Sequence, residues 1–175
     1  MVYSQVRHSM STGTVATFEA SLDRLDVDWT HASAAEFETV LRDVCSDPTI
    51  GVPLTHDVTL PDWVNTDPTP DDLRTAATGV TEAGLGIADY GSVVLQGTPD
   101  GIEPVSLFSD RHVAVLRKSD IAPGMGAAFE WLGETFRTGH SSAIIATGPS
   151  ATADMGALVK GAHGPKAVHV VILDE

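Results

Sequence analysis

The chain has 175 residues, of which 42% are hydrophobic; this suits one globular domain with a sizeable core and excludes a disordered chain. Asp and Glu number 24 against 10 Lys plus Arg, so the formal charge is −14, which disfavours nucleic acid and anionic membrane surfaces as partners. No apolar run reaches the roughly 18 residues of a spanning helix, so membrane insertion is not expected.

The acidic residues are spread along the chain rather than gathered in a tail, which indicates an acidic surface. Self-repulsion of this size destabilises a compact fold unless salt screens it. We therefore expect a cytoplasmic protein of a halophile that accumulates salt. The single cysteine, Cys45, excludes a disulfide framework and a cysteine-ligated iron–sulfur cluster within this chain.

The N-terminal part is expected to be helical. Residues 1–13 lack an apolar signal core and are predicted to form a flexible tail, with Met1 and Met10 both candidate starts, followed by a single domain over 14–175. Apolar residues at helical spacing predict a helix over Val15–Leu25. The capping box Ser33-Ala34-Ala35-Glu36 predicts the start of a second helix.

The middle of the chain alternates between strands and helices, which predicts an α/β domain with a largely parallel sheet flanked by helices. A strand end followed by a helical turn is expected over Val80–Ala88, which contains two glycines. The other expected elements are an edge strand over Thr49–Leu54, a surface loop over Pro61–Pro70 held down by Trp63, a helix over Asp71–Ala77, strands over Ser92–Leu95, Val105–Phe108 and His112–Leu116, and a helix over Gly124–Thr138.

The C-terminal part carries two polar segments between two apolar runs. Thr147–Asp154 and Lys160–Pro165 lie between Ala143–Ala146 and Val168–Leu173, which have the length and β-branched content of buried strands. About twenty residues separate the runs, which suits a crossover between parallel strands. Ligands bind at the carboxyl ends of such strands, so a site is expected there.

Two interpretations of this segment remain open. Ser150, Thr152 and Asp154 offer two hydroxyls and a carboxylate, and with the backbone around Gly148 and a nearby lysine they could receive a carboxylate or phosphate. Ser, Thr and Asp are also the preferred residues at the start of a helix, so the same residues could merely cap one.

These motifs carry a family resemblance. Gly148-Pro149-Ser150-Ala151-Thr152-Ala153-Asp154, Gly161-Ala162-His163-Gly164-Pro165 and the strand Val168–Leu173 resemble the hallmark of the LUD domain, more narrowly the lactate utilization protein C (LutC/YkgG) family. A further segment, Gly86-Ile87-Ala88-Asp89-Tyr90-Gly91-Ser92-Val93-Val94-Leu95, is similar to a family pattern that usually reads Ala-Glu-Thr-Gly-Thr or Ser before apolar residues. The chain departs from that pattern at Asp89 and Tyr90. The resemblance covers roughly residues 30–175.

The resemblance implies a fold, a function and a set of site residues. The fold is that shared by glucosamine-6-phosphate deaminase, ribose-5-phosphate isomerase and CoA transferases. The function is that of a subunit or accessory of an iron–sulfur system that oxidises L-lactate to pyruvate, with the redox centres on partner subunits and no cofactor on this chain. The ligand-binding residues implied are Gly91, Ser92, Gly148, Ser150, Thr152, Asp154, His163 and Gly164.

Other chemistries lack their sequence signals. The seven histidines include no pair at zinc-protease spacing, so no metal site is expected; His112 and His169 are interpreted as structural residues and His163 as a candidate ligand contact. The complete dinucleotide fingerprint is missing, and Ser150 lacks a nucleophile elbow. The alternative is a free-standing enzyme of the related fold acting on a sugar phosphate, CoA or folate-like ligand, for which Asp89 and Asp154 are the acids within the motifs.

Overall fold

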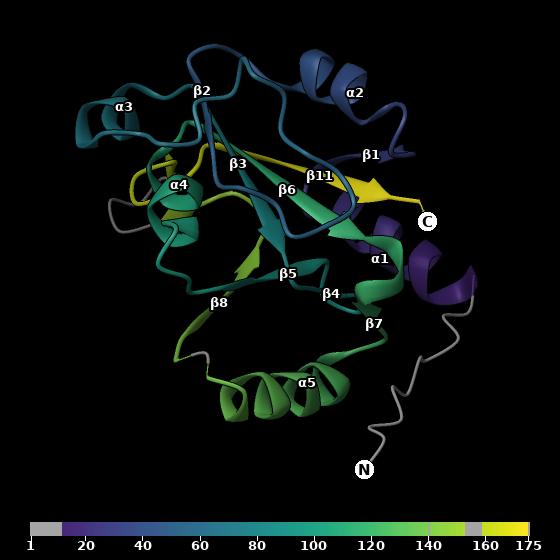
Figure 1. Ribbon diagram of the computed structural model, residues 1–175. Helices are drawn as coiled ribbons and strands as arrows, with labels where there is room; N and C mark the ends of the chain where they lie inside the picture. Colours follow the sequence, from purple (N-terminus) through teal and green to yellow (C-terminus); the bar gives the residue numbers. More distant parts are fainter. Residues whose placement is uncertain (1–11, 140, 153–158, 175) are drawn as a thin grey trace.

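The computed structural model describes residues 12–139, 141–152 and 159–174, which form two larger sheets, a short hairpin and surrounding helices (Figure 1). The helices are α1 (Thr12–Arg24), α2 (Phe37–Val44), α3 (Pro70–Thr75), α4 (Ile102–Phe108) and α5 (Met125–Arg137), with a 3₁₀ turn at Lys118–Asp120. The strands are β1 (Asp28–Ala32), β2 (Thr49–Gly51), β3 (Thr78–Ala83), β4 (Leu85–Ile87), β5 (Ser92–Gln96), β6 (Arg111–Arg117), β7 (Ile121–Ala122), β8 (Ala143–Thr147), β9 (Ala151–Thr152), β10 (Val159–Lys160) and β11 (Ala167–Leu173).

The larger sheet has the strand order β1-β11-β6-β3-β2, and every pairing in it is parallel. Its central strands β11, β6 and β3 are buried almost throughout, as expected for a parallel sheet covered on both faces. The short strand β2 lies at the edge, as the nearby Pro53 predicted. The prediction of an α/β domain with a parallel sheet flanked by helices is confirmed.

The second sheet was not expected. Its order is β7-β4-β5-β8, with antiparallel pairs on either side of β5. The predicted helical turn within Val80–Ala88 is therefore wrong, because Leu85–Ile87 is strand β4 and pairs with β5. The expected strand at Val105–Phe108 is also wrong, since these residues belong to helix α4, which begins after Gly101.

The described elements stack in layers (Figure 1). Alternation along β6 sends Val113 and Val115 to one face of the large sheet, against α2 and residues 58–64, and Ala114 and Leu116 to the other. On that second face, α1, α4 and the small sheet complete the main core. Helix α5 covers the outer face of the small sheet through Ala128 and Leu132.

Both predicted N-terminal helices form, and each buries apolar residues on one face. In α1, Val15, Phe18 and Leu22 are buried, and full burial of a side chain such as Phe18 contributes about 2–3 kcal/mol. Before α2, the backbone N–H and the hydroxyl of Ser33 both donate to the Glu36 carboxylate, at 3.1 and 2.6 Å. The helix begins only at Phe37, and its N-cap Glu36 makes no side-chain cap hydrogen bond, so the predicted capping box at Ser33 is wrong. Residues 12 and 13 already belong to α1, whereas residues 1–11 of the expected tail lie outside the described residues.

Two histidines interrupt apolar strands and are held inside the protein. The imidazole of His112 lies 2.8 Å from the hydroxyl of Thr81, and that of His169 lies 3.0 Å from the hydroxyl of Thr30. Burial lowers the pKa of His112 to about 4, and burial also lowers the pKa of His169. Both rings are thus neutral hydrogen-bonded parts of the core, and the structural interpretation of these residues is confirmed.

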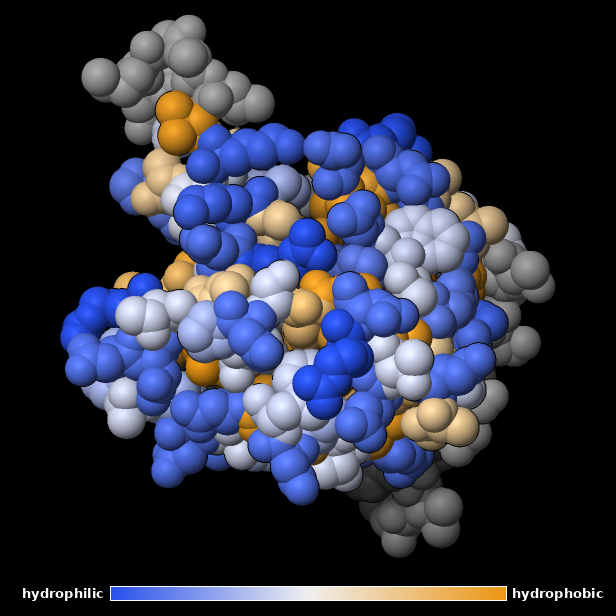
Figure 2. Space-filling model, turned by 90° about the horizontal axis from the view of Figure 1, so that it is seen from above, coloured by the Kyte–Doolittle hydropathy of each residue, from blue (hydrophilic) through white to orange (hydrophobic). Residues whose placement is uncertain are grey.

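The face shown in Figure 2 is dominated by hydrophilic side chains, with hydrophobic residues in small separate patches. Trp63 is partly buried against the core under α2, and the guanidinium of Arg42 lies 4.1 Å from its ring centroid, so this residue holds its loop down as predicted. Within the described ranges, no helix combines the length and the apolarity needed to cross a bilayer.

Candidate functional site

The two C-terminal motifs converge at the start of the loop that leaves β8. The backbone N–H of Ser150 donates to the carbonyl of Pro165 at 2.9 Å, and the N–H of Gly161 donates to the carbonyl of Ser150 at 2.8 Å. A Cβ added at Gly164 would lie 2.9 Å from the Cβ of Ser150, so a larger residue there would push the two segments apart. The segments that carry the family resemblance are therefore in direct contact.

The β4–β5 motif approaches the same region from the other side. The hydroxyl oxygens of Ser92 and Thr147 lie 2.7 Å apart across the β5–β8 pair. Gly91 has a φ of 63°, and a Cβ there would come within about 3 Å of Ser21 and Leu25 at the end of α1. Ser92 is fully buried, so its hydroxyl braces the two strands and is not open to solvent.

Gly148 connects these two groups of residues. Its φ of 68° turns the chain where it leaves β8. A Cβ added at Gly148 would lie in van der Waals contact with Leu25 and Val27, which connect α1 to β1. The end of α1 therefore contacts both Gly91 and Gly148. These contacts bring together Gly91, Ser92, Gly148, Ser150 and Gly164 of the predicted site residues.

The remaining predicted residues lie on the outer part of this loop. Thr152 is half-buried and pairs with Val159 in the β9–β10 hairpin, whereas the side chain of His163 is exposed. Ser150 precedes strand β9, so the alternative that it caps a helix is wrong. Asp154 lies outside the described residues.

The lysines near the motifs already contact carboxylates. The ammonium of Lys160 lies 3.1 Å from a carboxylate oxygen of Asp26, and that of Lys166 lies 2.7 Å from a carboxylate oxygen of Asp110. All four side chains are about half exposed or more, and pairs of this kind contribute at most about 1 kcal/mol. A bound anion could therefore exchange with these carboxylates at little cost.

The loop lies at the amino edge of the parallel sheet, not at the carboxyl edge that was expected. The N–H groups of Lys166 and Ala167 both donate to the carbonyl of Asp110, the residue before β6. The prediction of a parallel crossover fails because β8 pairs antiparallel with β5 in the small sheet, while β11 lies in the large one. Strand β8 is also only partly buried, because it lies at the edge of the small sheet among the described strands.

Polar side chains that the sequence analysis did not identify contact one another at the carboxyl edge of the large sheet. Glu82 of β3 accepts from the N–H of Thr55 at 2.6 Å and from its hydroxyl at 2.7 Å. His56 is buried beside it, with its Nδ1 3.6 Å from the Glu82 carboxylate, and burial lowers its pKa. No sequence pattern links residues 27 positions apart in this way, so only the structure reveals the contact.

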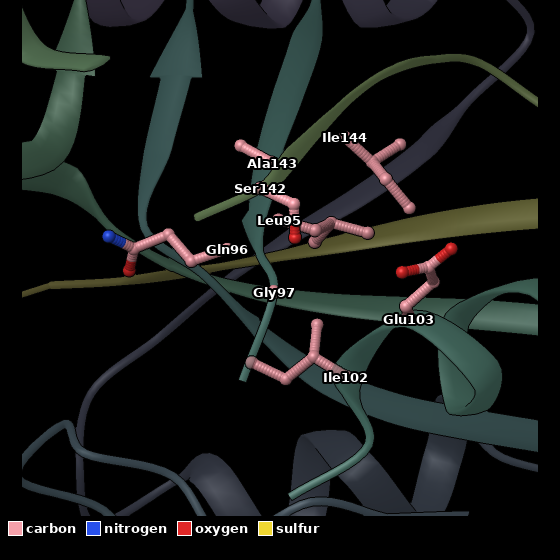
Figure 3. A pocket seen from close by; sticks show the side chains of 8 residues that line it. All are labelled: Leu95, Gln96, Gly97, Ile102, Glu103, Ser142, Ala143 and Ile144. Carbon is pink, nitrogen blue, oxygen red and sulfur yellow. The ribbon is translucent and has the colours of Figure 1, made fainter. Parts of the chain in front are cut away.

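A small cavity lies between β5, α4 and the residues leading into β8 (Figure 3). Its volume of about 10 Å³ has room for about one water molecule. The N–H of Gly97 donates to the carbonyl of Ser142 at 3.0 Å beside it, so the cavity follows from how these strands approach one another. In the described residues, no group of three or more His, Cys, Asp or Glu side chains is arranged to hold a metal ion.

Comparison with known proteins finds the same family that the motifs resemble. Residues 61–173 match the LUD domain family. Over 109 residues the chain is 35% identical to lactate utilization protein C of a Geobacillus strain, covering 59% of this chain and 45% of that protein. Over 104 residues it is 36% identical to the uncharacterized protein YkgG of Escherichia coli, covering 57% of this chain and 45% of that protein.

The fold also has a solved counterpart. A DUF162 family protein from Deinococcus radiodurans superimposes with a TM-score of 0.70 over 94% of this chain and 99% of that one, at 20% identity. The chain spans about 45% of the length of the lactate utilization proteins that it matches. The family match extends over more than half of the 175 residues, and the chain belongs to the LUD domain family, with lactate utilization protein C among its relatives.

Proposed function

We propose that this chain is a lactate utilization protein C-type component of a system that converts L-lactate to pyruvate. The observation that carries the proposal is the 35–36% identity to relatives of that name or family. The convergence of the motifs around Ser150 and Gly164 supports it, because the segments that define the resemblance form one local structure.

Within that system the chain would supply binding or assembly, and iron–sulfur partners would supply the redox centres. Lactate oxidation removes two electrons, which side chains alone do not accept at useful potentials. The one cysteine of the sequence, Cys45, is partly buried against the core, and this burial raises the pKa of its thiol to about 12. The acidic composition supports placing the protein in the cytoplasm of a halophile.

The loop around Ser150 and His163 is our candidate site for a small anion such as a carboxylate. The Ser150 hydroxyl can donate a hydrogen bond, and the exposed imidazole of His163 can donate another from the same loop. Lys160 and Lys166 lie next to these residues in the chain, in weak exposed pairs. Thr152, Gly148 and Asp154 complete the proposed set, with Ser92 and Gly91 bracing it from β5.

A ligand screen tests this site. Thermal-shift measurements with lactate, pyruvate, sugar phosphates, CoA and folates are expected to find a carboxylate that stabilises the protein, by about 2.7 kcal/mol at one hundred times its dissociation constant. Ser150→Ala and His163→Ala should abolish that shift and leave the ligand-free melting temperature unchanged. Ser141→Ala, which removes an exposed hydroxyl outside the motifs, is the control and should bind normally.

Two outcomes would contradict the site. Loss of about 1 kcal/mol of ligand-free stability in Ser150→Ala, without any ligand effect, would show that the motif only braces the fold. A shift with sugar phosphates, CoA or folates but not with lactate or pyruvate would favour a free-standing enzyme of the related fold.

A second test asks whether this chain carries a redox centre of its own. The purified chain is expected to be colourless and unable to reduce an artificial electron acceptor with L-lactate, because the proposed redox centres belong to partners. Tagged protein isolated from lactate-grown cells is expected to bring down iron–sulfur proteins, and that complex should reduce the acceptor. Lactate-dependent reduction by the isolated polypeptide without flavin or metal would refute this division of roles.

A further inference from the structure

The segment that follows β2 crosses one face of the large sheet, and its residues 53–60 are here called the strap (Figure 1). Buried and exposed side chains alternate along the strap, with His56, Val58 and Leu60 turned inward. Val58 and Leu60 pack in the apolar cluster that includes Val113 and Val115 of β6. His56 thus continues an apolar series of positions with a ring that can take up a charge.

The first part of the strap is fastened to the carboxyl end of β3 by Glu82. This carboxylate accepts from the backbone N–H of Thr55 at 2.6 Å and from its hydroxyl at 2.7 Å. Just before the strap, the N–H of Val52 still donates to the carbonyl of Val80 at 3.1 Å. Within the described part of the chain, residues 53–60 make no backbone–backbone hydrogen bond, so the Glu82 contacts are the main polar attachment of the strap.

The imidazole of His56 is enclosed beside this attachment. Its side chain is only 1% exposed, and neither ring nitrogen has a hydrogen-bond partner among the described residues. Its Nδ1 lies 3.6 Å from Oε2 of Glu82, the oxygen that already accepts from the N–H of Thr55. Closure of the strap therefore removes the hydrogen bonds that the imidazole makes with water and replaces none of them, which disfavours the closed position.

The charges around the imidazole decide how the strap responds to pH. Burial lowers the pKa of His56 below its ordinary value of 6.5 and outweighs Glu82 and the backbone of Val115, which act in the opposite direction. Arg117 disfavours a charged ring and Asp120 favours one, and these two side chains pair with each other at 2.7 Å. Below about pH 6.5 the released strap therefore binds a proton more readily than the closed strap, so a fall in pH favours release.

We propose that the strap is a cover operated by a proton: when His56 becomes charged, residues 53–57 swing away from the sheet and uncover Glu82. The charged ring is then hydrated, while Val58 and Leu60 stay packed. Ligands of parallel sheets bind at the carboxyl ends of the strands, so release opens that edge to a ligand. The proposal does not depend on the lactate role or on the anion site, which lies at the amino edge of the same sheet.

Hydrogen exchange of the Thr55 amide, followed by NMR between pH 7.5 and pH 5.5 in molar KCl, tests the proposal. Its protection, taken relative to the intrinsic exchange rate at each pH, should fall several-fold, with an upper limit of about tenfold for one histidine. The ring resonances of His56 should titrate over the same pH range in the unaltered protein. Thr55→Val, which removes the hydroxyl bond to Glu82, should lower the protection at pH 7.5 and keep its pH dependence.

Two histidine variants separate release of the strap from unfolding of the whole protein. His56→Gln should make the protection of the Thr55 amide independent of pH. His112→Gln, which removes a buried histidine of β6, is the matched control and should keep the fall, because that residue lies outside the strap. Constant protection in the unaltered protein, the same fall in His56→Gln, or loss of the fall in His112→Gln would each overturn the proposal. A rise in protection on acidification would do so too, because it would mean that the imidazolium pairs with Glu82 and tightens the strap.

Discussion

In dilute buffer the protein is expected to melt far below its melting temperature in molar KCl. Spreading 14 excess charges over a sphere of about 20 Å radius gives a self-energy of about 20 kcal/mol in water without salt, and unfolding relieves much of it. At 0.01 M salt the Debye length is about 30 Å, so screening is weak, whereas at 1 M it is about 3 Å. A difference on the order of 5 kcal/mol follows, which corresponds to about 10–20 °C.

A charge-reduced variant separates repulsion from general effects of salt. Asp57→Asn, Asp62→Asn and Asp67→Asn together remove three negative charges from exposed side chains of the segment after β2. Combined, they should raise the melting temperature in dilute buffer and leave it nearly unchanged in molar KCl, as followed by circular dichroism. Equal melting temperatures of the unaltered protein in dilute buffer and molar KCl would contradict the interpretation that its fold depends on salt.

Acid is expected to destabilise the protein through its buried histidines, even in molar KCl. The folded-state pKa of His112 is about 4, below the ordinary value of 6.5, so between these values the unfolded chain binds a proton that the folded protein does not. Stability is therefore fully present above about pH 6.5 and falls as the pH drops. The loss at pH 4 amounts to about 3 kcal/mol for this residue.

Burial also lowers the pKa values of His56 and His169, so these residues act in the same direction. Titration of the surface acids acts in the opposite direction, because it reduces the net charge as the pH approaches the isoelectric point of about 4.6. Molar KCl screens that second effect and leaves the contribution of the histidines. The pH dependence of stability should therefore be measured in molar KCl.

The variant His112→Gln isolates the main contribution. Glutamine can reach the hydroxyl of Thr81, which lies 2.8 Å from the imidazole, but it does not titrate in this range. Urea unfolding from pH 7 to pH 4 should show a clearly smaller loss of stability in this variant. His163→Gln, at an exposed position, is the matched control and should keep the full loss; an unchanged acid loss in His112→Gln would contradict the assignment.

The sequence predicted most elements of the large sheet because burial on both faces leaves a clear pattern. The apolar runs of β6 and β11 are continuous, and these strands lie at the centre of the sheet. Periodicity likewise indicated α1, α2 and α5, whose buried residues recur on one face. The contact between Ser33 and Glu36 is local, so it could be read from neighbouring residues, although it lies in the turn before α2 and does not cap the helix.

The small sheet could not be predicted because its strands are short and its pairings are set by distant residues. Ala143–Thr147 has the same composition as a strand of a parallel sheet, yet its register is fixed by β5, about fifty residues earlier. That pairing decides which edge of the large sheet the C-terminal motifs approach. Their expected place at the carboxyl edge was wrong for this reason alone.

The site was predictable in part. The motifs indicated that Ser150 and Gly164 belong together, and the structure brings them into contact. The need for Gly91 and Gly148 to pass the end of α1 was not visible in the sequence, since that helix lies far away in the chain.

Growth of the host on lactate tests the proposed function most directly. A strain from which this gene is deleted is expected to grow poorly or not at all on L-lactate and normally on pyruvate, because the step between the two is lost. A plasmid copy of the gene should restore growth on lactate, and a copy carrying Ser150→Ala with His163→Ala should not. Normal growth on lactate of the deletion strain, in a host without a second copy of the gene, would contradict a role in lactate utilization.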